Sequence, residues 1–199
     1  MIKVIIFDIG GVLMSSERSF DGIYEEFATV IGAPPEKIVK LHNDYLDRML
    51  YGKFSAAQFF ALIKKQFHIT GDLKKIWMNV AMKHITLNAE LLEMVDLLRV
   101  HQKTAILSNV SQIRGFVDER FDLYAHFDRS FLSYKLKMQK PSKKIFNYVL
   151  KAMKVKPQET LFVDDKEANL RVARELGIKC IQFNNNAQLR TELTPFGLL

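Results

Sequence analysis

The chain has 199 residues, of which 48% are hydrophobic and 26% are charged. These proportions are those of an ordinary globular protein, and they exclude a largely disordered chain. Lysine and arginine total 29 against 22 acidic residues, so the net charge is +7. One cysteine, Cys180, cannot form an internal disulfide, which fits a reducing compartment.

The first element in the chain is a short apolar run from Val4 to Phe7, followed by Asp8 and the pair Gly10-Gly11. Such a run is typical of a strand buried on both faces of a parallel sheet. It is too short for the core of a signal peptide or for a membrane span. We therefore expect a cytoplasmic protein with no membrane partner, in which Asp8 lies at the carboxyl end of a central strand.

Residues 15–85 have helical rather than strand periodicity, which predicts four short helices. Gly32 and the two prolines that follow Ala33 end the first, Ser55 is a cap for the third, and Asp72 is a cap for the fourth. Residues 1–14 and 86–199 are then the two parts of a core domain, and 15–85 form an inserted helical cap. A bundle inserted at this point can cover the site at the carboxyl edge of the sheet.

After the insertion, strands and helices alternate, which predicts parallel strands with right-handed crossovers. Asn88 caps a helix, and Pro141 suits the first turn of a lysine-rich helix. No aromatic–basic motif accompanies these lysines, so we interpret them as one solvated helix face and expect no nucleic-acid partner. The further predicted strands cover residues 104–107, 129–132, 160–163 and 178–183. With the first strand they give a five-stranded parallel sheet of the Rossmann-like α/β class.

Polar residues follow three of these strands: Asp8, Ser108 and the pair Asp164-Asp165. Carboxyl ends of parallel strands meet at one edge, where open α/β sheets bind ligands. Paired carboxylates can hold Mg²⁺ together with substrate phosphate oxygens. A carboxylate can also attack phosphorus and form an aspartyl-phosphate.

This arrangement resembles the haloacid dehalogenase (HAD) superfamily of phosphohydrolases, over essentially the whole chain. The segments that carry the resemblance are Phe7-Asp8-Ile9-Gly10-Gly11-Val12-Leu13, Leu107-Ser108-Asn109, Lys140-Pro141 with Ile145-Phe146, and Phe162-Val163-Asp164-Asp165 with Asn169. The insertion corresponds to the family's small α-helical cap. Its segment Tyr51-Gly52-Lys53-Phe54-Ser55 is similar to one in the branch that contains bacterial glucose-1-phosphate phosphatase.

The resemblance implies a Mg²⁺ site in which Asp8 is both nucleophile and metal ligand. The backbone carbonyl of Gly10 is a second ligand, and Asp165 is the carboxylate on the far side. Asp164 is a ligand or an acceptor that holds a neighbouring group.

The same resemblance assigns the phosphate-binding residues. Ser108 and Asn109 bind the phosphoryl group, and Lys140 offsets charge on the nucleophile and the phosphate. Asn169 orients the lysine or a metal-bound water. The expected function is Mg²⁺-dependent hydrolysis of a small phosphorylated metabolite, such as a sugar phosphate, by way of an aspartyl-phosphate.

One position departs from the family. Its phosphatases usually carry a second aspartate, the general acid and base, two residues after the nucleophile, where this chain has Gly10. A steep dependence of rate on leaving-group pKa is one expected consequence, because general acid–base catalysis supplies about 10²–10⁴-fold. Alternatively another group acts as the acid, and the candidates in the cap are Glu17, Arg18, His42 and His84.

Two alternatives share the fold. A haloacid dehalogenase uses the same nucleophile without metal, but its members usually carry serine or asparagine where Asp164-Asp165 stand. A catalytically silent binding or regulatory protein is favoured only by Gly10. The sequence indicates neither the physiological substrate nor the oligomeric state.

Overall fold

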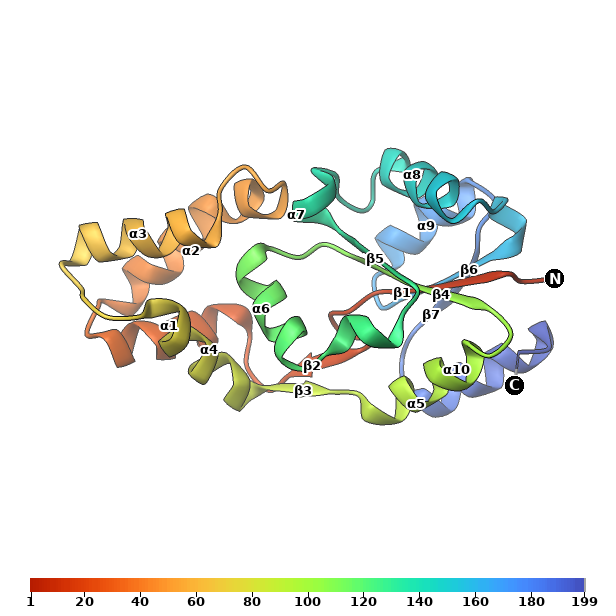
Figure 1. The fold of residues 1–199 in the computed structure, drawn as a ribbon, viewed down its shortest axis with the longest axis horizontal. Helices are drawn as coiled ribbons and strands as arrows, with labels where there is room; N and C mark the ends of the chain where they lie inside the picture. Colours follow the sequence, from red (N-terminus) through yellow and green to blue (C-terminus); the bar gives the residue numbers. More distant parts are fainter. Residues whose placement is uncertain (199) are drawn as a thin grey trace.

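The computed structural model describes residues 1–198. Its centre is a parallel sheet with the strand order β5-β4-β1-β6-β7 (Figure 1). The strands are β1 (Val4–Phe7), β4 (Lys103–Ser108), β5 (Arg129–Leu132), β6 (Thr160–Asp164) and β7 (Lys179–Gln182). The predicted five-stranded, Rossmann-like α/β fold is confirmed.

Helices and short 3₁₀ turns connect the strands of the sheet and follow the last of them. In chain order they are α5 (Ala89–Leu98), α6 (Gln112–Arg120), η1 (Leu123–His126), α7 (Ser133–Leu136), α8 (Lys143–Met153), η2 (Pro157–Glu159), α9 (Glu167–Glu175), α10 (Asn186–Leu193) and η3 (Thr194–Phe196). Ser142 caps α8, so the lysine-rich helix follows Pro141 as predicted, and the proline lies just before its first turn.

Both faces of the sheet are covered, which explains the unbroken apolar run of β1. Val4 and Ile6 pack in one cluster with apolar residues of α8 and α9. Ile5 and Phe7 belong to a second cluster with residues of α5, α6 and α10. Figure 1 shows α8 and α9 on one side of the sheet and α5 and α10 on the other.

The inserted segment forms the four expected helices. They are α1 (Phe20–Ile31), α2 (Pro35–Leu50), α3 (Ala56–Phe67) and α4 (Leu73–His84). Ser55 and Gln58 form a reciprocal capping box at α3, and the Asp72 carboxylate accepts the Lys75 N–H at α4. Gly32 ends α1 with a φ of +71°, a conformation that glycine adopts without steric cost. In Figure 1 these helices lie at the end of the molecule away from the N-terminus.

Two short strands that the sequence does not predict connect the cap helices to the sheet. β2 (Met14–Ser16) and β3 (Ile85–Leu87) pair antiparallel, and the Ser15 and Thr86 hydroxyls share a hydrogen bond of 2.9 Å. This ribbon lies at the predicted boundaries of the insertion. The apolar cluster that contains Ile5 nevertheless continues into the cap, so the division into 1–14 with 86–199 and 15–85 stays a prediction.

The segment after β7, for which the sequence predicts no element, forms α10 and η3. Asn185 caps α10 by accepting the Gln188 N–H. The side-chain amides of Asn186 and Asn88 exchange two hydrogen bonds of 2.9 Å, which hold the start of α10 to the start of α5. None of the helices within residues 1–198 combines the length and the hydropathy needed to cross a membrane.

A buried histidine lies in the core of the cap. His42 is 5% exposed, and its ring stacks on Tyr24 with a centroid separation of 3.9 Å. Burial lowers the pKa of His42 to about 4, although a hydrogen bond with Asn43 and the charge of Asp21 act in the opposite direction. The folded protein therefore keeps this ring neutral where an unfolded chain would protonate it.

We expect His42 to make the free energy of unfolding depend on pH. The unfolded chain takes up this proton near pH 6.5 and the folded protein only near pH 4, so stability is lost as the pH falls through that interval. The loss attributable to this ring is up to about 3 kcal/mol. Urea unfolding at several pH values should show a weaker dependence for His42→Phe than for the native chain. An identical dependence in both proteins would contradict the assignment.

Candidate active site

The carboxyl ends of β1, β4 and β6 place three polar side chains at one edge of the sheet. Because β1 lies between β4 and β6, Asp8 has Ser108 on one side and Asp164 on the other. The N–H of Asp8 donates to the Val163 carbonyl, which continues the sheet pattern up to the carboxylate. All three side chains are buried, with 5%, 4% and 0% exposure. The structure thus brings Asp8 together with residues that are 100 and 156 positions further along the chain.

Lys140 lies between two of these carboxylates. Its Nζ is 3.0 Å from Asp8 Oδ1 and 2.6 Å from Asp164 Oδ2, and its side chain is 1% exposed. A buried ammonium is stable only when carboxylates or other acceptors surround it. Lys140 is therefore a buried partner of these carboxylates and not a surface lysine, and its contact with phosphate stays a prediction.

Asp164 is an acceptor for groups on three sides. Its carboxylate accepts from the Lys140 ammonium, from the Asn169 side-chain amide at 3.0 Å to each oxygen, and from the Lys166 N–H at 2.8 Å. These bonds occupy both oxygens. Of the two functions that the sequence leaves open for Asp164, these contacts favour the acceptor that holds Lys140 and Asn169 in place.

Asp165 differs from Asp164 in its hydrogen bonding. Its Oδ1 is buried and has no hydrogen-bond partner within residues 1–198. Carboxylate oxygens of Asp8, Asp164 and Asp165, here called the acidic cluster, lie within 4.8 Å of one another. Burial first, and then the charges of Asp8 and Asp164, raise the pKa of Asp165. An unpartnered oxygen among close carboxylates fits Mg²⁺, which prefers such ligands and would remove their repulsion.

The two glycines after Asp8 have different surroundings. Gly11 has a φ of +79°, and a Cβ there would lie 2.6 Å from Asp165 Oδ2, so glycine permits the close approach of this loop to Asp165. At Gly10 a Cβ would meet no atom within 4 Å. A side chain at position 10 therefore has room within the described structure.

The loop after β4 is held by groups from two other loops. The Asn109 side chain donates to the Lys140 carbonyl and accepts from the Lys140 N–H, both at 2.8 Å. The Ser133 hydroxyl accepts from the Val110 N–H and donates to the Val110 carbonyl. Asn109 thus positions Lys140, and its predicted contact with phosphate stays a prediction. Ser133 is not predicted from the sequence, because its partner is 23 residues away and no motif surrounds it.

The candidate acids in the cap make contacts elsewhere. His84 is 2.6 Å from Glu26, Arg18 is 3.7 Å from the same carboxylate, and the Glu17 N–H donates to the His84 carbonyl. His42 is enclosed in the cap core. Within residues 1–198 no hydrogen bond or ion pair joins any of the four candidates to the acidic cluster.

The segment between α2 and α3 contacts the core domain closely. The Ala56 N–H donates to the Gln112 side chain of α6 at 3.0 Å. Gly52, at a φ of +63°, lies so close to α7 that a Cβ there would be 2.1 Å from the Tyr134 carbonyl oxygen. This contact, here called the cap-loop contact, is a second connection of the cap to the core besides the β2–β3 ribbon.

Replacement of Gly52 by alanine is expected to lower the free energy of unfolding by about 1–3 kcal/mol more than a matched glycine replacement, because the loop must shift away from Tyr134. Gly32→Ala is the control, since Gly32 has a φ of +71° and open space around its Cβ position. Both variants place an alanine in the left-handed region and share that cost. The difference between their free energies of unfolding therefore measures the close contact with Tyr134. Equal losses in urea unfolding would contradict this reading.

Comparison with known proteins agrees with the geometry of the site. The sequence pattern of the haloacid dehalogenase-like hydrolases matches residues 2–177. D-ribitol-5-phosphate phosphatase of Bacteroides thetaiotaomicron is 31% identical, and the alignment covers 98% of each chain.

Solved structures of HAD family proteins are also similar to this chain. A HAD family enzyme of Bacteroides thetaiotaomicron, crystallised in complex with magnesium and inorganic phosphate, is 25% identical and has a TM-score of 0.80, over 95% of this chain and 99% of that one. A predicted HAD-like family hydrolase from Porphyromonas gingivalis is also 25% identical, with a TM-score of 0.78 over 98% of each chain.

Proposed function

Because this chain belongs to the haloacid dehalogenase-like hydrolases, we propose that it is a Mg²⁺-dependent phosphatase acting on a small phosphorylated sugar or polyol. The observation that carries the proposal is the acidic cluster with Lys140 buried between two of its members. The magnesium and phosphate of the related crystal structure and the substrate named for the related phosphatase support it.

In this proposal Asp8 is the nucleophile. A carboxylate oxygen of Asp8 attacks phosphorus, the ester oxygen leaves, and water then hydrolyses the aspartyl-phosphate. Lys140, already in contact with Asp8 Oδ1, offsets negative charge on the nucleophile and on the incoming phosphoryl group. Asp164 and Asn109 keep Lys140 in place through its ammonium and its backbone.

The metal ligands in this proposal are Asp8, the Gly10 carbonyl and Asp165, with Asp164 and Asn169 as supporting groups. When bound, Mg²⁺ would neutralise phosphate charge and polarise the phosphoryl group. Ser108, buried at the end of β4, would bind a phosphate oxygen together with the loop that contains Asn109.

Gly10 and the relatives indicate two different classes of substrate. Without an acid beside the leaving group, esters of stabilised leaving groups, such as anomeric sugar phosphates, react more readily than alkyl phosphates. The relative named for ribitol 5-phosphate indicates a polyol-sized substrate instead. A comparison of sugar 1-phosphates with pentitol and pentose 5-phosphates separates these two possibilities.

A phosphate-release screen over such compounds, with and without chelator, tests the function. We expect release that stops when the metal is removed and returns when Mg²⁺ is added. Release that persists in chelator would contradict the metal site. No release from any compound, with Mg²⁺ binding intact, would favour the catalytically silent alternative.

The dehalogenase alternative has less support. That chemistry displaces halide without metal and has no use for the unpartnered Asp165 beside Asp8. Chloride release from 2-chloropropionate is the direct measurement, and we expect none.

We also propose a cytoplasmic location and no nucleic-acid partner. Cys180 is half-buried, and burial raises the pKa of its thiol to about 12, so it is poorly suited to disulfide exchange. The lysines of α8 lie opposite the buried residues Ile145, Phe146 and Val149, as expected for a solvated helix face.

A further inference from the structure

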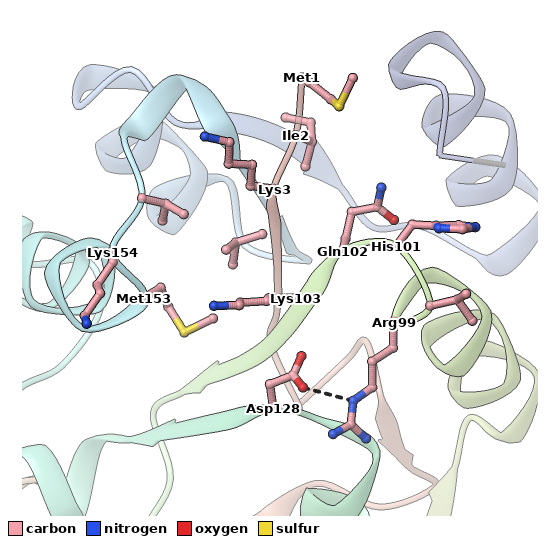
Figure 2. A pocket seen from close by; sticks show the side chains of 13 residues that line it. Met1, Ile2, Lys3, Arg99, His101, Gln102, Lys103, Asp128, Met153 and Lys154 are labelled. Atoms are coloured by element: carbon pink, nitrogen blue, oxygen red, sulfur yellow. Dashed lines mark hydrogen bonds and ion pairs between the residues drawn. The ribbon is translucent and has the colours of Figure 1, made fainter.

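A hollow of about 490 Å³ lies at the amino edge of the sheet, opposite the acidic cluster. Its walls come from the start of β1, the turn between α5 and β4, the residue before β5, and the end of α8 (Figure 2). A smaller hollow of about 260 Å³ shares Lys103, Asp128, Met153 and Lys154 with it and adds Arg129. Together these two, here called the basic hollow, have the size of metabolite sites in proteins.

The charge of the basic hollow is strongly positive. Its walls carry five cationic side chains and a single carboxylate among the described residues; the cations are Lys3, Arg99, Lys103, Arg129 and Lys154. Asp128 does not offset the lysines, because Oδ1 pairs with Arg99 at 3.1 Å and Oδ2 accepts the Thr104 N–H at 2.8 Å. Lys3 is paired with Glu159 at 2.6 Å.

Three cations are left without a partner. Within residues 1–198, Lys103, Arg129 and Lys154 take part in no ion pair. Lys154 follows the last residue of α8, where a cation offsets the negative end of the helix. Lys103 and Arg129 are the first residues of neighbouring strands, so that explanation does not apply to them.

The floor of the basic hollow is apolar. Met153 is 5% exposed and lies between Lys103 and Lys154, and Figure 2 shows the Lys103 side chain extended toward it. Ile2 and Val155 add to this apolar lining. A ligand that fits carries two or more negative charges, and an organic part, where the ligand has one, would contact Met153.

We propose that the basic hollow binds a small phosphorylated metabolite with two or more negative charges. The inference does not depend on the proposed function, because the hollow lies at the opposite edge of the sheet from Asp8. Two sources offer this chemistry: an inorganic polyphosphate, and a nucleoside phosphate whose organic part would contact Met153.

Methyl NMR of the full chain gives a local readout. Methionine methyl groups are labelled, the Met153 resonance is assigned with Met153→Leu, and pyrophosphate or ATP is added in chelator at constant ionic strength. We expect a saturable shift of the Met153 resonance. If ATP reaches half-saturation at a lower concentration than pyrophosphate, the organic part of ATP contacts the apolar floor at Met153. If the two concentrations are equal, only the phosphates contribute to binding.

The matched variants remove two charges each. Lys103→Gln with Lys154→Gln should weaken binding about tenfold or more, because charged hydrogen bonds to the ligand are lost. Lys64→Gln with Lys65→Gln, two exposed lysines in the last turn of α3, should leave it unchanged. The proposal is overturned if the Met153 shift is absent or does not saturate, or if both double variants bind equally.

Discussion

Replacing Asp8 with asparagine is expected to lower kcat for phosphate release by at least about 10⁴-fold, because an amide cannot act as the nucleophile. The amide would keep nearly the shape of the carboxylate, and Lys140 would retain Asp164 as its partner at 2.6 Å. The measurement is steady-state phosphate release at saturating Mg²⁺ and saturating substrate, on the best substrate of the screen. Residual activity within tenfold of that of the native chain would show that Asp8 is not the nucleophile.

Folding provides the control for this variant. The oxygens of Asp8 lie within 4.8 Å of those of Asp164 and Asp165, and the three carboxylates repel one another. Removing one charge should therefore leave the free energy of unfolding in chelator unchanged or higher. A marked loss of stability would show that the lost activity reflects misfolding instead of chemistry.

Introducing an aspartate at position 10 is expected to raise kcat for alkyl phosphates by about 10²-fold or more. A Cβ at Gly10 meets no atom within 4 Å, and Gly10 is not in the left-handed region, so neither a clash at Cβ nor backbone strain opposes a side chain there. The charges of Asp8 and Asp165 would raise the pKa of the new carboxyl and help it to hold a proton for the leaving group.

Gly10→Asn is the matched variant, since its side chain has the same shape but no acidic proton. Aryl phosphates of graded leaving-group pKa give the readout: the rates should fall steeply with that pKa in the native chain and in Gly10→Asn, and less steeply in Gly10→Asp. Equal slopes in all three proteins would mean that another group already protonates the leaving oxygen.

The fold is largely readable from the sequence because its signals are local. The run from Val4 to Phe7, the caps Ser55, Asp72 and Asn88, and the stop at Gly32 each act within a few residues, and the structure places an element boundary at each of them. The β2–β3 ribbon and α10 are missed for the opposite reason. Their stabilising partners are distant in the chain: Met14 pairs with Leu87, 73 residues away, and Asn88 bonds to Asn186, 98 residues away.

The candidate site also has some features that the sequence predicts and others that it does not. Strand ends predict that Asp8, Ser108 and Asp164 share an edge, since parallel topology alone brings them together. The detailed bonding does not follow from the sequence: Asn109 bonds to the Lys140 backbone, and Ser133 holds Val110. Both are hydrogen bonds between loops, whose conformations depend on the completed sheet.

The cap-loop contact has a consequence for turnover. Besides the β2–β3 ribbon, the cap contacts the core through Gly52 and Ala56, through α4, where Lys74 lies 3.8 Å from the Phe116 ring of α6, and through the shared apolar cluster. The cap can swing outward about the ribbon only if these other contacts break. These contacts must break each time the cap opens. For a substrate whose chemistry is fast, we expect departure of the alcohol product to be the slow step, and the steady-state rate to decrease as solvent viscosity rises.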